Sequence, residues 1–367
     1  MKGNDLAYYL TLDQCPGIGP VAFRKLIEAD NFTISDFVTA SSKQLINQGL
    51  NQKQISALKN PDQESIEQTI EWLESDQSHH ILILDNPDYP ELLKELNDAP
   101  PILYAVGRKE LLSTPQLAIV GSRNCTPGGA STAKEFSAYL AQSGFTITSG
   151  MALGIDQHAH LGALASTGNT IAVVGTGADR IYPSRNKQLA HQIAESGLII
   201  SEFPLGTPPN SNNFPKRNRI ISGLSVATLV IEATRKSGSL ITARCSMEQG
   251  REVFAIPGSI HNPQAKGCHH LIRQGAKLVD QVSDIIDDIG SLLGVVAQQA
   301  DPATEPAFTQ LDSEYQLLLN SIGYDPVSID TLTQRTSLTI EQLSSMLLIL
   351  ELQDHIQTAP GGLYVRS

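Results

Sequence analysis

From about residue 115 onward, short apolar runs alternate with longer helical stretches along the chain. Seven runs have the length of buried strands: Leu117–Val120, Phe145–Thr148, Thr170–Val174, Leu198–Ser201, Ala227–Ile231, Val253–Ile256 and Lys277–Val279. Helical stretches such as Gly129–Gln142 and Ile155–Ala165 lie between them. Short buried strands that alternate with helices are typical of a parallel, doubly wound α/β sheet, whose ligands bind at the carboxyl ends of the strands.

The first 78 residues show a different pattern, in which short helical stretches are separated by glycine turns. Cys15–Pro20 carries a glycine–hydrophobe–glycine turn before the helical Val21–Ile27, and a similar turn recurs at Gln48–Asn51. Such turns are typical of a helix-hairpin-helix or SAM-like domain, whose turn amides can contact a phosphate. A small helical bundle explains the same pattern. We expect the α/β domain to occupy residues 79–288.

The carboxyl-terminal part predicts a linker and a small third domain. Residues 289–309 have the composition of a linker, and residues 310–367 predict three helices and a hairpin that turns at Pro360–Gly362, as in a winged helix. A third helix that reads DNA normally carries Lys and Arg. Here its apolar positions are Ile340, Leu343, Leu347 and Leu350, and its exposed positions include Thr339, Glu341, Gln342 and Ser345. We therefore expect this domain to bind protein, or nothing.

Charge is distributed unevenly along the chain, whose formal net charge at pH 7 is −12. The net charge is −9 over residues 1–104 and −10 over residues 281–367, but it is +7 over residues 105–280. A cationic middle between two acidic segments indicates an anionic ligand for the α/β domain. In the acidic first domain, the charge favours a helical bundle or a protein contact over DNA binding.

Nothing in the sequence points to a membrane or to an oxidising compartment. No segment has the roughly 18 consecutive apolar residues that a membrane-spanning helix needs, and the amino terminus has no apolar signal core behind a basic head. The four cysteines are widely spaced and form no Cys-x-x-Cys pair. We therefore expect reduced thiols, no zinc site and a cytoplasmic location.

Several predicted strands of the α/β domain end in a glycine- or serine-rich turn. Such turns let a ligand approach the backbone, and helix amino termini present free N–H groups to an anion. The turn residues are Gly121, Gly150, Gly175, Gly177 and Ser237-Gly238-Ser239. Arg123 and the cations Lys216, Arg217 and Arg219 are expected close by. Together these features predict a phosphate-binding crevice along one edge of the sheet.

The sequence offers few signs of catalysis. The P-loop signature is absent, the third glycine of a dinucleotide fingerprint is missing, and there is no nucleophile elbow. Asp156, Glu202 and Glu232 follow strands and are candidates for acid–base chemistry, but each is more simply an ion-pair or capping partner. The expected role of His158, His160 and the two histidines of the Cys268–His270 cluster is hydrogen bonding. We expect no enzymatic activity, no metal and no cofactor.

Specific motifs run through residues 80–280. The most specific are Phe214–Leu224 and Ser237–Ala243. The others are Ala118–Arg123, Ser149–Asp156 with Ala159-His160, Gly175–Gly177 through Tyr182-Pro183, Ser201–Pro204 and Gly250–Gly258. In these motifs the chain resembles the DNA-processing protein A family (DprA, also called Smf), and the helical head and winged-helix tail fit that family's layout. One departure is His269, where the family usually has Asn.

The resemblance implies an extended Rossmann-like domain that binds single-stranded DNA without sequence preference. It also implies a homodimer that loads the RecA recombinase onto incoming DNA during natural transformation. Arg123, Lys216, Arg217 and Arg219 would hold phosphates, and Ser122, Asn218 and the Ser237–Ser239 turn would donate further hydrogen bonds. Phe214 would contact a base or sugar, since aromatic faces accept any base.

Several alternatives remain open at this point. Phe214 is equally well explained as a core residue, and at least one of the three cations of Phe214–Arg219 could instead pair with Glu202 or Glu232. The same fold could also carry a nucleotide-cleaving enzyme resembling the nucleoside-monophosphate phosphoribohydrolases (LOG proteins), but their Pro-Gly-Gly-x-Gly-Thr motif is absent. A third alternative is a nucleotide-sensing module whose winged helix regulates transcription. The tail, with only two cations over residues 281–367, argues against it.

Overall fold

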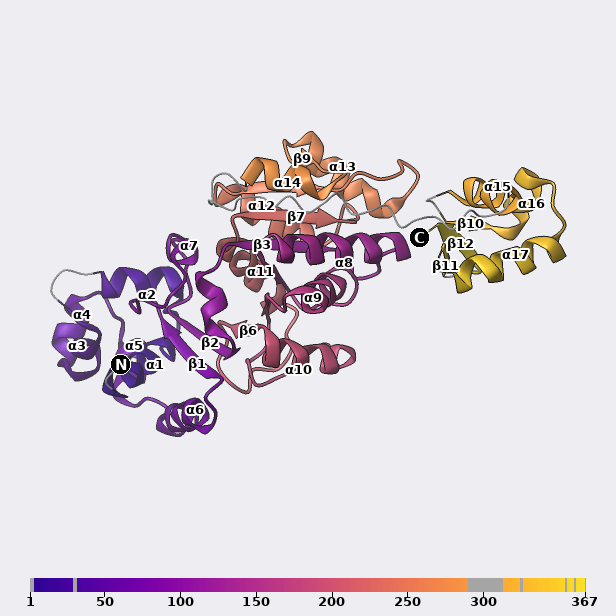
Figure 1. The fold of residues 1–367 in the computed structure, drawn as a ribbon. Coiled ribbons are helices and arrows are strands. Elements are labelled where there is room, and N and C mark those ends of the chain that lie inside the picture. Colours follow the sequence, from indigo (N-terminus) through magenta and orange to yellow (C-terminus); the bar gives the residue numbers. More distant parts are fainter. Residues whose placement is uncertain are drawn as a thin grey trace.

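The structure is a computed structural model that describes residues 3–28, 32–289, 313–323, 326–353, 355–359 and 361–366. A helical head is followed along the chain by an α/β domain and then by a small domain of helices and short strands (Figure 1). The predicted linker, residues 289–309, lies outside the described residues except for Ile289. No helix in the described ranges is long and apolar enough to cross a bilayer.

The head consists of short helices joined by tight turns. The helices are α1 (Gly3–Asp13), α2 (Pro20–Ile27), α3 (Ile34–Thr39), α4 (Ser42–Asn47), α5 (Gln52–Lys59) and α6 (Gln63–Ser75). The two predicted glycine turns join α1 to α2 and α4 to α5. Gly17 and Gly49 have φ angles of 79° and 86° there, a region that residues with a side chain rarely adopt. Capping boxes at Ser41 and Asn51 satisfy the free N–H groups that start α4 and α5.

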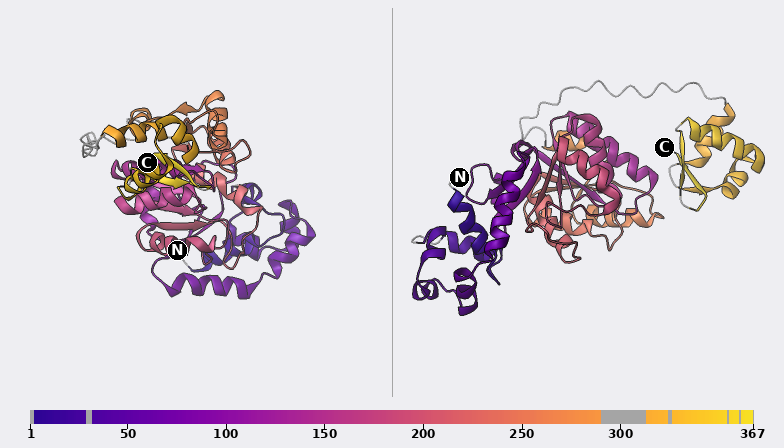
Figure 2. Two further views of the ribbon diagram at one scale, coloured as in Figure 1. Left: turned by 90° about the vertical axis from the view of Figure 1, so that its right-hand side faces the viewer. Right: turned by 90° about the horizontal axis from the view of Figure 1, so that it is seen from below.

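The core of the head continues into the edge of the sheet. Phe23, Phe37 and Leu45 are fully buried in it, and Ile81 and Ile102 from the first two strands belong to the same apolar cluster. Burial of each such side chain stabilises the fold by roughly 1.5–3 kcal/mol. The head helices therefore lie beside the β1–β2 edge of the sheet (Figure 2).

The α/β domain is built on a sheet with the strand order β1-β2-β6-β5-β4-β3-β7-β8-β9. The strands are β1 (His79–Ile83), β2 (Ile102–Gly107), β3 (Gln116–Gly121), β4 (Thr146–Ser149), β5 (Thr170–Val173), β6 (Leu198–Ser201), β7 (Ala227–Ile231), β8 (Glu252–Ala255) and β9 (Lys277–Leu278). The seven predicted strands are confirmed to within one residue at each end. They form the parallel part of the sheet, from β6 to β9.

The sheet differs from the prediction at one edge. Strands β1 and β2 were not predicted. They pair antiparallel with each other, and β2 also pairs antiparallel with β6, so the sheet is mixed. Only the four-residue helix α7 (Glu91–Lys94) lies between them. Because antiparallel neighbours need no crossover helix, the alternation of strand and helix that identifies a parallel sheet is missing there.

Helices cover both faces of the sheet, as a doubly wound fold requires. Neighbouring strand residues face opposite sides, so Leu117 and Ile119 pack into one apolar layer while Ala118 and Val120 pack into the other. The first face is covered by α8 (Pro127–Gln142), α9 (Ile155–Ser166), α10 (Lys187–Ser196) and α14 (Val282–Ile289). The second is covered by α7, α11 (Asn213–Leu224), α12 (Ser239–Glu248) and α13 (Lys266–Arg273).

The last domain has the predicted winged-helix elements. They are α15 (Ser313–Ile322), β10 (Val327–Ser328), α16 (Ile329–Thr336), α17 (Ile340–Leu352), β11 (Ile356–Ala359) and β12 (Leu363–Arg366). Leu343, Leu347 and Leu350 of α17 are buried as predicted, but Ile340 is 55% exposed because it begins the helix. The capping box of Thr339 and Gln342 fixes that end of the helix.

Candidate nucleic-acid interface

A cavity of about 660 Å³ lies where β3 and β7 end and where α11 and α12 begin. We call it the sheet-edge cavity. The predicted site residues that line it are Gly121, Ser122, Arg123, Phe214, Arg217, Asn218, Ser237, Gly238 and Ser239. Those that do not line it are Gly150, Gly175, Gly177, Lys216 and Arg219. The structure therefore brings most of the predicted site together at the carboxyl edge of the sheet.

The loop after β3 presents Arg123 to solvent at this cavity. Ser122 donates its backbone N–H to the carbonyl of Glu232 at 2.7 Å, and its Oγ accepts the N–H of Asn124 at 3.1 Å. The Glu232 carboxylate accepts from the backbone N–H and the hydroxyl of Thr126, the N-cap residue of α8, at 2.8 and 2.6 Å. Glu232 thus fixes the loop, while the Arg123 side chain is exposed.

The three cations on α11 lie in three different environments. Arg217 is only 4% exposed, and its Nη1 donates to the carbonyls of Gly150, at 2.7 Å, and of Val173. Burial lowers the pKa of its guanidinium to about 10, an effect opposed by the nearby carboxylate of Asp156, so the group stays charged at neutral pH. Arg217 therefore ties α11 to the ends of β4 and β5.

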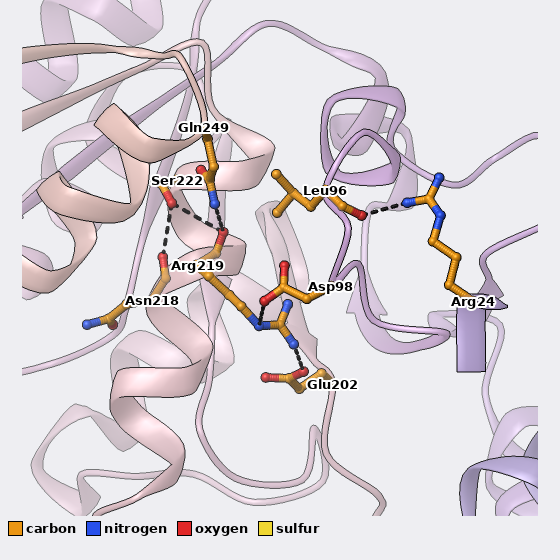
Figure 3. Close-up of polar contacts among 8 residues, drawn as sticks. All are labelled: Arg24, Leu96, Asp98, Glu202, Asn218, Arg219, Ser222 and Gln249. Atoms are coloured by element: carbon orange, nitrogen blue, oxygen red, sulfur yellow. Dashed lines mark hydrogen bonds and ion pairs between the residues drawn. The ribbon is translucent and has the colours of Figure 1, made fainter. Parts of the chain in front are cut away.

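Arg219 does not line the cavity, and its guanidinium pairs with the carboxylates of Asp98 and Glu202 (Figure 3). It donates to Glu202, which follows β6, and its Nε lies 3.2 Å from Oδ2 of Asp98 in the segment before β2. Arg24 of the head donates to the carbonyl of Leu96 in the same segment at 2.6 Å. The sequence left open whether at least one of the three cations pairs with Glu202 or Glu232, and the structure shows Arg219 paired with Glu202.

Lys216 is the third cation, and its side chain is exposed. It makes no hydrogen bond or ion pair with any residue that the structure describes, although its charge helps to lower the pKa of Glu202 against the larger, raising effect of burial. Lys216 and Arg123 are therefore the cations of the predicted cluster that remain available to a ligand.

The amino terminus of α12 closes another side of the cavity. The hydroxyls of Ser237 and Ser239 lie 2.7 Å apart, and Ser239 donates its backbone N–H to Oγ of Ser237 at 3.4 Å. Asn218 donates from Nδ2 to the carbonyl of Gly238 at 3.3 Å, which joins α11 to this turn. Hydroxyls in this position can donate to an anion that also meets the positive end of the helix.

The four turn glycines are explained by internal packing. A Cβ at Gly150 would lie 2.3 Å from Nη1 of Arg217, and a Cβ at Gly175 would lie 3.0 Å from Cδ1 of Phe214. Protein atoms crowd Gly121 and Gly177 in the same way. Their lack of a side chain thus makes room for the residues around the cavity.

An aromatic pair stands beside Arg123. The rings of Phe214 and Tyr182 have centroids 5.5 Å apart and are tilted by 32°, and the Arg123 guanidinium carbon lies 5.8 Å from the Phe214 ring centroid. Phe214 is partly buried, whereas Tyr182 is 45% exposed and also lines the cavity. The sequence analysis missed Tyr182 as a site residue. The Tyr-Pro step within the matching motifs was the signal that could have found it.

Two buried polar groups hold the loop between β4 and α9. Asp156 accepts the N–H groups of Gly150 and Ala152 at 3.2 and 3.4 Å, and burial raises the pKa of its carboxyl. His160 accepts the N–H of Met151 at Nε2 and donates from Nδ1 to Thr170 at 2.7 Å. Burial, aided by the charge of Arg217, lowers the pKa of His160 to about 3, so the ring is neutral.

The polar groups expected at strand ends thus act within the protein. Asp156, Glu202 and Glu232 all accept hydrogen bonds from protein groups, as described above. His269, at the position where Asn was expected, donates to the carbonyl of Gly258 at 3.0 Å. Within the described ranges, no three His, Cys, Asp or Glu side chains lie together as a metal site would require. The cavity therefore has the chemistry of a binding site for an anion with an aromatic part.

Two family models match the chain. The model described as DNA recombination-mediator protein A matches residues 80–290, and the model of the DprA winged helix domain matches residues 299–362. Among curated proteins, the chain is 41% identical to protein Smf of Escherichia coli K12 over 324 residues, 87% of this chain and 85% of that protein. It is 48% identical to DNA processing protein DprA of Streptococcus pneumoniae R6 over 198 residues, 54% of this chain and 70% of that protein.

Solved structures give the same picture. DNA processing protein A from Streptococcus pneumoniae superposes with a TM-score of 0.61 at 36% identity, covering 74% of this chain and 98% of that one. DNA processing protein A from Helicobacter pylori, whose structure was described for its unique single-stranded DNA binding mode, superposes with a TM-score of 0.54 at 31% identity. That match covers 58% of this chain and 97% of the Helicobacter chain.

Proposed function

This chain belongs to the DNA recombination-mediator protein A (DprA/Smf) family, and we propose that it binds single-stranded DNA at the sheet-edge cavity without sequence preference. The observation that carries the proposal is the exposed Arg123 beside an aromatic pair at the rim of a cavity lined with hydroxyl and amide groups. Cations with stacking platforms are the usual means of holding a single strand whatever its sequence.

The described contacts divide the site residues into two groups. In the proposal, Arg123 and Lys216 neutralise phosphates, and Ser122, Asn218, Ser237 and Ser239 donate hydrogen bonds to the backbone of the strand. Arg217 and Arg219 position α11, because their guanidinium groups already hold carbonyls and carboxylates of the protein. Gly238 lets the DNA strand approach the start of α12, since among the described residues no atom beyond its own chain neighbours lies within 4 Å of where its Cβ would be.

We further propose that a homodimer delivers the bound strand to the RecA recombinase during natural transformation. The name of the matching family, a recombination mediator, supports this step. Two copies would place two cavities on one strand and so raise the effective concentration of the second site. In this account the protein is a scaffold with no catalytic residue, because the strand-end carboxylates are engaged with protein donors.

Fluorescence anisotropy with labelled oligonucleotides of one sequence, single-stranded and double-stranded, tests the proposal at several salt concentrations. We expect tighter binding of the single strand, weakening steeply with salt because phosphate neutralisation releases counterions. Equal binding of both forms would contradict it. RecA filament formation on DNA with and without the protein tests the delivery step. Release of ribose phosphate from a nucleoside monophosphate would instead support an enzyme.

A further inference from the structure

We infer that Tyr182, seated on Phe214, is the surface on which a nucleobase of the bound strand stacks. The inference rests on the proposed single-stranded DNA binding and assigns the base contact to a specific ring. It differs from the sequence-based expectation, which gave a base or sugar contact to Phe214. The reasons lie in which ring is open to solvent, what holds it in place and what chemistry surrounds it.

Phe214 is the less exposed of the two rings, although it also lines the cavity. Its Cδ1 and Cε1 atoms would lie 3.0 and 3.2 Å from a Cβ at Gly175, which places the ring against the turn that follows β5. Tyr182 and the Arg123 guanidinium both lie within 6 Å of its centroid, at 5.5 and 5.8 Å. These neighbours surround much of the Phe214 ring, so we assign it the role of a support for Tyr182.

Tyr182 is more exposed to solvent than Phe214. Nearly half of its surface is exposed, although it lines the cavity and packs on a neighbouring ring. Its ring packs against Phe214 with a centroid separation of 5.5 Å and a tilt of 32°. An exposed aromatic ring that rests on a second ring in this way is suited to sequence-independent stacking.

The surroundings match the two parts of a nucleotide. Pro209 and Pro215 line the same cavity as the two rings and add apolar surface to it, while Ser237, Ser239 and Arg123 supply hydroxyls and a positive charge. The base of a nucleotide suits the apolar part, and its phosphate suits the polar part. The aromatic part of the cavity therefore favours a flat, uncharged base over a second anion.

The test compares two ligands with equal numbers of phosphates, an oligothymidylate and an abasic deoxyribose-phosphate oligomer of the same length. Tyr182→Ala should bind the oligothymidylate roughly 5- to 100-fold more weakly than the wild type, the equivalent of one lost stacking contact. The same variant should bind the abasic oligomer as well as the wild type does. Tyr182→Phe, which keeps the ring, should behave like the wild type on both.

Each other outcome overturns the inference in a recognisable way. Equal losses on both ligands would show that Tyr182 acts through the phosphate contacts or the fold, and an unimpaired Tyr182→Ala would show that no base stacks there. A thermal unfolding curve for Tyr182→Ala that matches the wild type excludes misfolding. If the wild type bound neither ligand, the proposed function itself would fail. If the inference alone failed, the wild type would still bind the oligothymidylate, but the two Tyr182 variants would not differ from it as predicted.

Discussion

Nε of Arg219 lies 3.2 Å from Oδ2 of Asp98, and the same guanidinium donates to Glu202. The three residues belong to α11, to the segment before β2 and to the turn after β6. The helix that supplies much of the cavity wall is thereby fastened to two other parts of the domain. A cation that the sequence assigns to DNA is used to position the helix.

Breaking the Arg219–Glu202 pair should destabilise the protein. The two side chains are only 14% and 10% exposed, so without Arg219 the Glu202 carboxylate would be a mostly buried charge with no ion-pair partner, and without Glu202 the Arg219 guanidinium would keep only Asp98. We expect Arg219→Ala and Glu202→Gln each to lower the free energy of unfolding by on the order of 3 kcal/mol, measured by urea denaturation. The double variant should lose less than the sum of the two. Strict additivity would contradict the pairing, and Asp98→Asn, at a 45% exposed side chain, is the milder control.

The salt dependence of DNA binding should also show that Arg219 makes no phosphate contact. Because it pairs with protein carboxylates, Arg219→Ala removes no phosphate contact, so the slope of log affinity for single-stranded DNA against log salt should stay that of the wild type. The affinity itself should fall, as α11 loses an anchor. A shallower slope for Arg219→Ala, measured by anisotropy, would show that this guanidinium reaches the DNA.

Asp13 should make stability depend on pH. Burial, with a smaller contribution from Glu202, raises the pKa of its carboxyl to about 6, whereas an unfolded chain has a value near about 3.9. A raised folded pKa means that the contribution of this group is fully present below about pH 4 and is lost as the pH rises through 6. Asp13→Asn should therefore stabilise the protein at pH 8 by on the order of 3 kcal/mol and have little effect at pH 4. The same shift in urea midpoint at both pH values would contradict this.

His160 predicts the opposite dependence. Burial lowers the pKa of its ring to about 3, below the value near about 6.5 of an unfolded chain. The stability that it contributes is present above pH 6.5 and is lost as the pH falls toward 3. Nitrogen NMR should show His160 as the neutral Nδ1–H form at pH 5, because Nε2 accepts the N–H of Met151. Protonation of this ring between pH 7 and pH 5 would be inconsistent with the contacts observed.

Periodicity was sufficient to predict the parallel part of the sheet, since each of its strands is a short run followed by a helix, and all except the exposed edge strand β9 are mostly buried. It was insufficient for β1 and β2, whose antiparallel pairing leaves no helical signal between them. Ile340 shows a similar limit. It continues the apolar spacing of α17, but the position next to the N-cap residue lies at the end of the helix, outside the core.

At the candidate site, the sequence locates the motif residues but does not show which way each side chain points. The three cations of α11 are close in the chain, but helical geometry turns Arg217 inward, Arg219 toward Glu202 and leaves Lys216 in solvent. The need for glycine at Gly150 was visible in the sequence, whereas its cause was not. The atom that approaches it belongs to Arg217, 67 residues further along the chain.

The salt dependence of single-stranded DNA binding by Arg123→Ala and Lys216→Ala tests the central claim most directly. Arg273→Ala, at an exposed arginine of α13 outside the predicted cation cluster, is the matched control for a lost positive charge. We expect Arg123→Ala and Lys216→Ala each to weaken binding and to reduce the slope of log affinity against log salt by about 0.7, the value for one phosphate contact with a single strand. Arg273→Ala should keep the wild-type slope. Wild-type slopes for all three variants would contradict the assignment of the sheet-edge cavity as the DNA site.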